Sequence, residues 1–283
     1  MNLFQTKKPY SAGIDNCRVY RTNYVYEGIR MINNLRSPEI IKLANQRNIL
    51  RVEELAEHFN VSVQTIRKDL NKLCSDGQLE RVHGGAIIPS QIENIEYQQR
   101  KNINFKGKQA IGQGCANEIP NDICLFMGIG TSTETAAKLL LGHKNLLIVT
   151  NNLNIANILK KNIQTEVVVT GGNLRKSDGA LIGQPVLETV QNFKFDLAIM
   201  GCSALDNEGN MLDFDTQEIL VNQSIISQAK KTYLVADHTK FLRRAPIKIA
   251  SLSSVDCFFT DNKLEQPLLD KCALWNTNVK YSK

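Results

Sequence analysis

Apolar and polar positions in residues 33–88 follow the period of short helices. Apolar side chains recur at helical spacing in three stretches, residues 38–44, 52–59 and 63–73. Asn60 and Val61 form a turn before the last stretch, and Ser62 is a natural N-cap for it. The string LERVHGGAI, residues 79–87, has the pattern of a hairpin with a Gly-Gly turn. Three helices followed by a hairpin predict a winged helix-turn-helix.

The outer face of the third predicted helix carries side chains that hydrogen-bond base edges and phosphates. Any amphipathic helix has a polar and partly basic outer face, so this helix alone does not decide between DNA binding and plain solvent exposure. The turn, the polar helix start and the basic hairpin together favour DNA binding. We therefore predict a DNA contact surface made of Ser62, Gln64, Thr65, Arg67, Lys68, Asn71, Arg81, His83, Gly84 and Gly85.

The string VEELAEHFNVSVQTIRKDLNKLCSDGQLERVHGGA, residues 52–86, resembles the DNA-binding domain of DeoR-type bacterial transcription regulators, above all in TIRKDL and HGGA. Two positions depart from the family. Lys68 stands where a second Arg is usual, which keeps the charge but loses a bidentate fork. Arg51 replaces the usual Ser or Thr cap of the second helix, and a lost cap costs about 1 kcal/mol.

The stretch after the hairpin, residues 89–108, is polar and rich in Gln and Asn, without a clear period. It is typical of a linker, and we expect a helix to follow it at residues 109–118. Family members carry an Arg and a Lys that match Arg100 and Lys108. We interpret both as structural or interdomain contacts.

Continuous apolar runs alternate with helical patterns through residues 109–283. Six runs read as strands, at residues 123–127, 146–149, 166–170, 197–201, 232–236 and 257–260. Strands that are apolar on both faces predict a mostly parallel sheet with helices on either side, an α/β domain. In such sheets ligands bind at the carboxyl ends of the strands.

The predicted strand ends carry glycine, hydroxyl and amide groups. GIGTSTE, residues 128–134, opens a helix and could cradle a phosphate with its helix amides and hydroxyls, although a tight strand-to-helix turn alone also favours glycine. Acidic side chains further on accept from polyol hydroxyls, and a lysine binds phosphate; Asp215 reads equally well as a solvated loop residue. We predict effector contacts from Gly128, Gly130, Thr131, Ser132, Thr133, Thr150, Asn151, Asn152, Gly171, Gly172, Asp213, Glu218 and Lys240.

The region from Arg100 to Asp261 resembles the effector-sensing domain of DeoR-type regulators, which is similar in fold to ribose-5-phosphate isomerase. The strings IVTNNLNIAN, VTGGNLRKSDGALIG and GNMLDFDTQE carry the resemblance. It implies a repressor of carbon or glycerol metabolism that a phosphorylated small metabolite releases from its double-stranded operator, with glycerol 3-phosphate as the expected effector and another sugar phosphate as the alternative. Gly128 stands where the family commonly has Asp. We also expect a homo-oligomer, a dimer or a tetramer.

A sugar-phosphate isomerase is the rival hypothesis, since Glu218 and Lys240 would suit proton transfer. Against it, the acidic GADE-type string of the isomerase is missing where GCSALD, residues 201–206, stands, and the chain devotes a whole unit to DNA binding. Fold similarity alone does not carry an activity. We therefore expect no enzyme.

Composition excludes several classes of protein. The chain has 283 residues, 42% of them hydrophobic and 22% charged, which excludes extended disorder as the main state and leaves room for two domains. No apolar run approaches the roughly 20 residues of a membrane helix, and residues 1–25 show no signal peptide, so we expect a cytoplasmic protein. Seven cysteines without a CxxC pair and four scattered histidines predict neither disulfides nor a metal, and we expect no cofactor.

The net charge of +6 is a poor argument for nucleic acid because charge at the contact face matters more. Residues 1–30 hold five basic and two acidic side chains, a balance of +3, and show no apolar period. We predict that they are translated leader sequence and that Met31 is the true start. The alternative is a basic arm that adds non-specific phosphate contacts.

Overall fold

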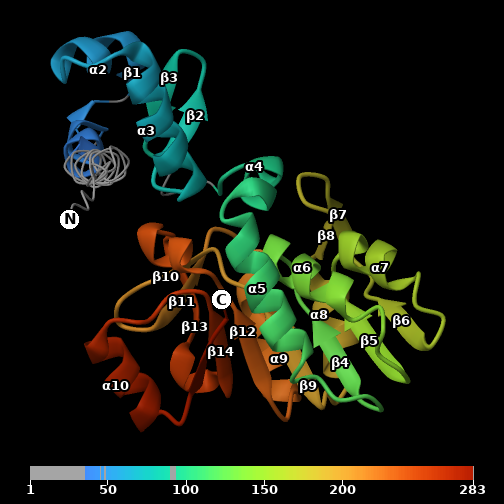
Figure 1. Cartoon of the computed structure of the whole chain (residues 1–283). Helices are drawn as coiled ribbons and strands as arrows, with labels where there is room; N and C mark the ends of the chain where they lie inside the picture. Colours follow the sequence, from blue (N-terminus) through green and yellow to red (C-terminus); the bar gives the residue numbers. More distant parts are fainter. Residues whose placement is uncertain (1–35, 45, 48, 90–93, 283) are drawn as a thin grey trace, which may run out of the picture.

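The structure is a computed structural model that describes residues 36–44, 46, 47, 49–89 and 94–282. It consists of a small N-terminal unit and a larger α/β unit (Figure 1). Residues 1–35, which include the predicted leader and the predicted start at Met31, lie outside the described residues. Within the part of the chain that is described, no helix is long and apolar enough to cross a bilayer.

The small unit packs three helices against a short sheet, as the sequence predicts. Residues 36–44 are helical and are followed by α2 (Val52–His58) and α3 (Val63–Ser75). The strands β1 (Leu50–Arg51), β2 (Glu80–Val82) and β3 (Gly85–Ile87) form a sheet in the order β1-β3-β2. The two residues of β1 are too few to show a period and were not predicted. The core of the small unit is built from Ile40, Leu50, Leu55, Ile66, Leu70 and Leu73, each at most 2% exposed.

Helix starts in this unit follow the expected capping pattern. The hydroxyl of Ser62 accepts the Thr65 amide at 3.1 Å, which satisfies one free donor at the start of α3. Arg51 precedes α2 without a side-chain cap bond. Arg36 instead ties the first helix to α3, through a 2.9 Å ion pair from its Nε to the buried Asp69.

Residues 97–116 correct the predicted linker. Most of them lie in two helices, α4 (Tyr97–Asn102) and α5 (Phe105–Ala116), so the predicted boundary at residue 109 falls inside a helix. The apolar face was hidden because a lysine occupies one of its positions: Lys108 is only 3% exposed, beside the buried Ile111 and Cys115. A polar residue at a core position breaks the hydrophobic period that sequence reading depends on.

The large unit is built on a seven-stranded sheet in the order β15-β14-β12-β9-β4-β5-β6, with parallel pairs throughout. Six of these strands were predicted and end within one residue of the expected position. The seventh, β15, alternates polar and apolar residues at an edge, which hides it from a search for continuous apolar runs. The strands are β4 (Cys124–Met127), β5 (Leu146–Thr150), β6 (Thr165–Val169), β9 (Leu197–Met200), β12 (Thr232–Val235), β14 (Cys257–Thr260) and β15 (Asn278–Tyr281).

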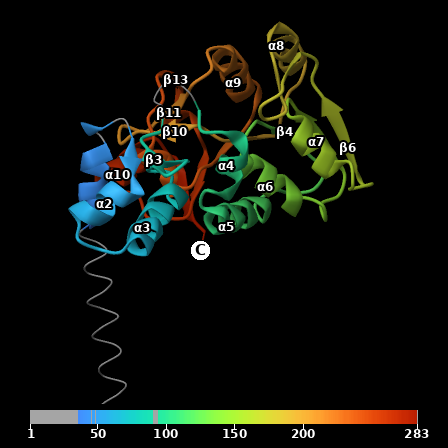
Figure 2. The same ribbon diagram turned by 90° about the horizontal axis from the view of Figure 1, so that it is seen from above.

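Helices cover both faces of this sheet (Figure 2). On one face Leu125 and Met127 pack against α5 and against α6 (Thr131–Leu139) and α7 (Leu153–Leu159). On the other face Phe126 packs against α8 (Gln184–Gln191) and α9 (Gln217–Gln228). The last helix, α10 (Gln266–Leu274), packs on Leu234 and Phe258 through Leu268. The predicted layered α/β architecture is therefore confirmed.

Several short elements complete the unit. They are the hairpin β7 (Asn173–Arg175) and β8 (Ala180–Ile182), the sheet of β10 (Ala204–Leu205), β11 (Asn210–Asp213) and β13 (Ile247–Ser251), and the 3-10 helices η1 (His238–Leu242) and η2 (Leu252–Ser254). After β4 the chain adds β5 and β6 on one side and then returns to place β9 on the other side. This change of direction opens a crevice at the carboxyl ends of β4 and β9.

Candidate functional site

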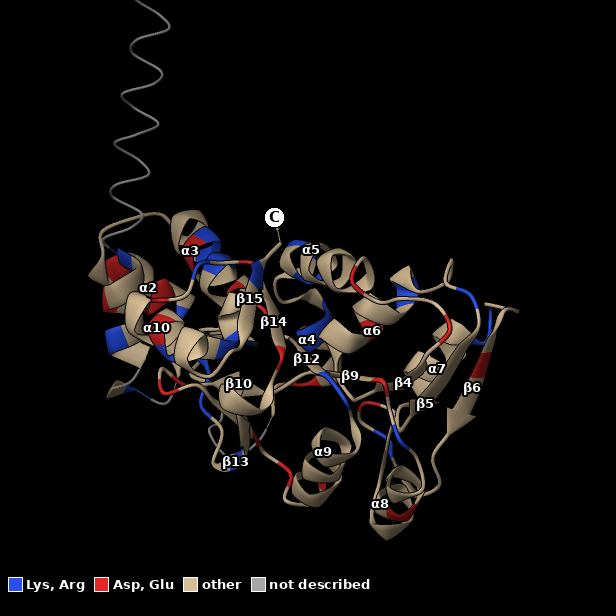
Figure 3. Ribbon diagram, turned by 90° about the horizontal axis from the view of Figure 1, so that it is seen from below, with Lys and Arg blue, Asp and Glu red and all other residues tan. Residues whose placement is uncertain are grey.

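The predicted DNA contact residues lie on α3 and on the β2–β3 hairpin. Eight of the ten are exposed, Thr65 is half-buried and Gly85 is buried. Arg67 and Lys68 point away from the core side of α3, where Ile66 and Leu70 are fully buried. Figure 3 marks the basic positions along α3 and the acidic ones along α2. The surface of α3 and the hairpin can therefore meet phosphates and base edges.

The two glycines of the hairpin have different roles. Gly84 adopts a φ of 75° at the turn, in the left-handed region that glycine tolerates best, and nothing stands near its missing side chain. Gly85 lies against β1, where a Cβ would come within 1.9 Å of the Leu50 carbonyl oxygen. Gly85 is therefore needed for the close approach of two strands, and it is not positioned to touch DNA.

A small cavity of about 40 Å³ lies in the crevice at the ends of β4 and β9, and α6 starts at its wall. It is lined by seven of the predicted effector residues, Gly128, Gly130, Thr131, Ser132, Asp213, Glu218 and Lys240. An adjoining cavity of about 400 Å³ shares the walls Asn94, Arg100, Arg175, Asp178, Asp213 and Glu218. The structure thus brings together the glycine loop, the acidic pair and the lysine that the sequence singled out.

The other six predicted residues do not line this cavity, and four of them have bonds elsewhere. The hydroxyl of Thr133 donates to Gly130 and that of Thr150 to Met127, each at 2.7 Å. The Asn151 amide donates to the Leu181 carbonyl, and the Asn152 side chain caps α7.

Gly171 and Gly172 follow β6, on the side of β4 away from β9. Gly172 has a φ of 126°, and a Cβ there would approach the Ile182 carbonyl oxygen to 2.7 Å. These polar strand ends follow strands on the far side of β4 from β9 and do not line the cavity.

The start of α6 presents backbone donors to the cavity. Gly130 precedes the helix with a φ of 139°, and the hydroxyl-bearing Thr131 and Ser132 form its first turn. The first amides of a helix have no partners within it and carry partial positive charge, which favours an anion. A Cβ at Gly128 would stand 3.5 Å from the nearest atom, so this glycine is not required by close packing.

Basic side chains surround the same cavity. Lys240 has no carboxylate within ion-pair distance among the residues described, and burial together with the charge of Arg243 lowers its pKa to about 8. Arg100 pairs with Asp178 at 3.3 Å, while its buried Nε has no partner in the described structure. Lys108 does not line the cavity, but its Nζ donates to the carbonyl of the lining residue Arg100, and burial and the charge of Lys240 lower its pKa to about 7. This wall of the cavity carries positive charge that an anion would neutralise.

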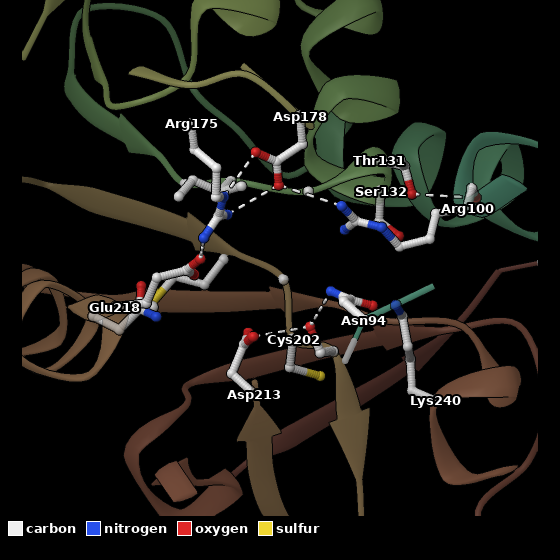
Figure 4. A pocket seen from close by; sticks show the side chains of 17 residues that line it. Asn94, Arg100, Thr131, Ser132, Arg175, Asp178, Cys202, Asp213, Glu218 and Lys240 are labelled. Carbon is white, nitrogen blue, oxygen red and sulfur yellow. Dashed lines mark hydrogen bonds and ion pairs between the residues drawn. The ribbon is translucent and has the colours of Figure 1, made fainter. Parts of the chain in front are cut away.

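The opposite wall is acidic and is organised by Arg175. Its guanidinium reaches Asp178 at 2.9 Å and Glu218 at 2.5 Å (Figure 4). It also reaches Asp215 at 2.7 Å. Burial raises the pKa of Asp213, and burial with the nearby Asp213 raises that of Glu218 to about 7 in spite of Arg175. Asp215, which the sequence left open, is part of this ion-pair group. Carboxyl groups held in this way can accept hydrogen bonds from hydroxyls.

The lining residues that sequence reasoning missed include Asn94, Arg100, Arg175 and Asp178. Arg175 and Asp178 belong to a hairpin of three-residue strands, where charged letters look like an ordinary solvated turn. The sequence singles out Arg100 as a structural or interdomain contact, and the structure places it in the cavity wall. Asn94 stands in a polar stretch, and no periodic signal separates it from its neighbours.

The chain matches two protein-family models. Residues 36–92 match the DeoR-like helix-turn-helix domain, and residues 103–262 match the DeoR C terminal sensor domain. The chain is 42% identical over 222 residues to the glycerol-3-phosphate regulon repressor of Escherichia coli strain K12, covering 78% of this chain and 88% of the relative. Identity to the protein of the same name from Haemophilus influenzae is 44% over 230 residues, covering 81% and 90%.

Solved structures with a related arrangement include ribose 5 phosphate isomerase A from Neisseria gonorrhoeae, with 16% identity and a TM-score of 0.36 over 48% of this chain and 53% of that one. Another is eIF2B beta from Chaetomium thermophilum, with 10% identity and a TM-score of 0.42 over 55% and 48%. Three relatives matched over most of the chain are named as repressors. With both domain models matched in order, the chain belongs to the DeoR family of transcription regulators.

Proposed function

We propose that this regulator represses genes of glycerol metabolism and leaves its operator when glycerol 3-phosphate binds the sensor cavity. The observation that carries the proposal is the division of one cavity into a basic wall with helix amides and an acidic wall. The relatives with 42% and 44% identity, which are named for the glycerol-3-phosphate regulon, support this choice of effector.

The phosphate would lie between the start of α6 and Lys240. Thr131 and Ser132 offer amides and hydroxyls, while Lys240 and Arg100 offer charge. These groups are at least partly withdrawn from water, so they attract a dianion more strongly than exposed cations would. A phosphate placed there would also supply the counter-charge that Lys240 lacks among the described residues.

The hydroxyls would face Asp213 and Glu218. The small size of this cavity, about 40 Å³, favours a short polyol chain. The adjoining cavity of about 400 Å³ gives longer sugar phosphates a place to extend. A phosphorylated three-carbon polyol is our first choice, and another sugar phosphate is the alternative.

Operator binding is proposed for α3 and the hairpin, with Arg67 as the main base-reading side chain. Such modules place the second helix of the motif in the major groove and pair two copies on two half-sites. We therefore propose a homo-oligomer, a dimer or a tetramer, acting on DNA in the cytoplasm.

The test is a titration of operator binding with glycerol 3-phosphate, with glycerol as the matched control. Glycerol keeps the hydroxyls but has no anion, so only the phosphate ester should weaken the complex. Release by another sugar phosphate alone would preserve the site and change the effector. Equal release by glycerol would contradict the phosphate site.

A further inference from the structure

The segment that joins the two units supplies part of the cavity wall. β3 ends at Ile87 and α4 begins at Tyr97, and Asn94 and Arg100 from this stretch both line the cavity. The other lining side chains all come from the α/β unit. The site is therefore built partly from the connection that leads to the DNA-binding unit.

Asn94 is held from two sides. Its Nδ2 donates to the Ser203 hydroxyl at 3.1 Å (Figure 4). An Arg243 Nη donates to its Oδ1 at 2.6 Å. The Ser203 hydroxyl in turn donates to Asp213 at 3.1 Å. Asn94 thus connects the segment to the acidic wall of the cavity, through Ser203, and to Arg243, which follows η1.

Arg243 fixes which way the Asn94 amide points. A guanidinium only donates, so the atom facing it must be the carbonyl oxygen, and Nδ2 then faces Ser203 and the cavity. Arg243 is 8% exposed, stands 5.7 Å from the Phe214 ring centre and has no carboxylate within ion-pair distance in the described part of the chain. The oriented amide offers one hydrogen to Ser203 and a second to an oxygen in the cavity.

The chain next to Asn94 is anchored on the same unit. Ile95 is 4% exposed and Tyr97 is 9% exposed. The Tyr97 hydroxyl donates at 2.8 Å to Glu134 on α6, the helix whose start faces the cavity. Asn94 therefore reaches the cavity when residues 94–97 are packed on the α/β unit. We call this arrangement docked.

We propose that Asn94 is an effector ligand carried by the connecting segment, so that effector binding and docking favour each other and the docked arrangement has low operator affinity. The inference rests on the proposed function, in which the effector weakens operator binding. A ligand that contacts Asn94 only when the segment is docked must shift the population toward that state. Operator DNA must then weaken effector binding by the same factor.

The experiment measures the dissociation constant of glycerol 3-phosphate for the full-length chain, with and without a duplex selected by that chain from random DNA. For a coupled regulator the ratio of the two constants should lie in the range of roughly 5 to 150. In Asn94→Ala the affinity should fall several-fold and the ratio should move to within about twofold of one.

The matched control is Asn222→Ala, because Asn222 lines the same cavity but belongs to α9. Asn222→Ala should weaken effector binding, and its ratio of the two dissociation constants should equal that of the unmodified chain. If Asn94→Ala keeps that ratio, the inference is overturned while the proposed function stands. If the unmodified chain binds no glycerol 3-phosphate, the proposed function fails and the inference fails with it.

A second variant tests the direction of the coupling without any ligand. Asn94→Asp gives Arg243 an ion pair, which favours the docked arrangement, so operator affinity should fall several-fold. Asn94→Ala removes both bonds and should leave operator affinity equal or raise it. Tighter operator binding by Asn94→Asp than by Asn94→Ala, with both variants folded by circular dichroism, would refute the assignment of the docked state.

Discussion

The two units of this protein present positive charge in opposite ways. In the DNA-binding unit Arg67 and Lys68 are exposed on α3, and no ion pair to either is found in the described structure. In the sensor Lys240 and Arg243 are largely buried, and their pKa values are lowered by that burial. Exposed cations act at long range and are screened by salt. Buried ones act at short range and select the charge and shape of a small ligand.

The largest effect should come from adding negative charge to the buried site. In Thr131→Asp the carboxylate would meet the phosphate at the start of α6, where Thr131 is 7% exposed. Two unit charges at 4 Å repel by roughly 4 kcal/mol at an effective dielectric of 20, about three orders of magnitude in affinity. The variant should bind operator and no longer release it with glycerol 3-phosphate in a gel-shift titration.

Thr131→Ser, which keeps the hydroxyl, serves as the control and should respond like the unmodified chain. An acidic residue in the first turn is compatible with a helix, so the variant should fold. Release of Thr131→Asp at the ordinary ligand concentration would show that the phosphate does not lie at this helix start.

The next largest effect is expected on operator binding, at the exposed face of α3. Arg67→Ala should abolish specific operator binding and leave the fold intact, because Ile66 and Leu70 keep the core contacts of α3. A lost bidentate base contact costs about 1–3 kcal/mol of discrimination. Salt-matched gel shifts should show this loss, while Lys263→Ala, an exposed lysine on the sensor, should bind normally. Unchanged affinity of Arg67→Ala would remove Arg67 from the interface.

The same contrast explains how much the sequence could reveal. The proposed DNA-binding surface lies on one helix and the next hairpin, so local period and residue type were enough to propose it. The cavity collects residues from Asn94 to Lys240, and a local pattern cannot show which hairpin folds over which strand end. Arg175 looks like a solvated charge until the chain is folded. The polar ends of β5 and β6 looked equally suitable, but topology turns them away from β9.

Raising the pH should weaken effector binding to the sensor and leave the operator contacts unchanged. The pKa of Lys240 lies at about 8, so its charge is present below pH 8 and lost above it. If phosphate binds the charged form, the affinity for glycerol 3-phosphate should fall about tenfold from pH 7 to pH 9 by proton linkage. Calorimetric titrations measure this, and Lys240→Arg, which stays charged, should show a flatter profile. An equally steep profile in Lys240→Arg would assign the pH dependence to other groups.

The smallest effect is expected where the two units meet. The Asn104 amide donates to the Ser75 carbonyl at the end of α3, and its side chain donates to Asp261 at 2.7 Å. Asp261 also pairs with His238 at 2.8 Å, which raises the pKa of His238, while this histidine and Asn104 help to hold the pKa of Asp261 at about 2.

Because the pKa of His238 is raised, the pair stabilises the fold fully below the ordinary value of about 6.5 and loses this contribution as the pH rises through the raised value. Asp261 remains ionised down to about pH 2, so its side of the pair persists through the mildly acidic range. Asp261→Asn should therefore lower the melting temperature more at pH 5.5 than at pH 8.5. The difference should correspond to about 1 kcal/mol or less, as for other partly exposed pairs. Any change in the hydrogen bonds to Asn104 is the same at both pH values, so only the difference reports the ion pair. An equal loss at both would show that the charge of His238 does not change between them.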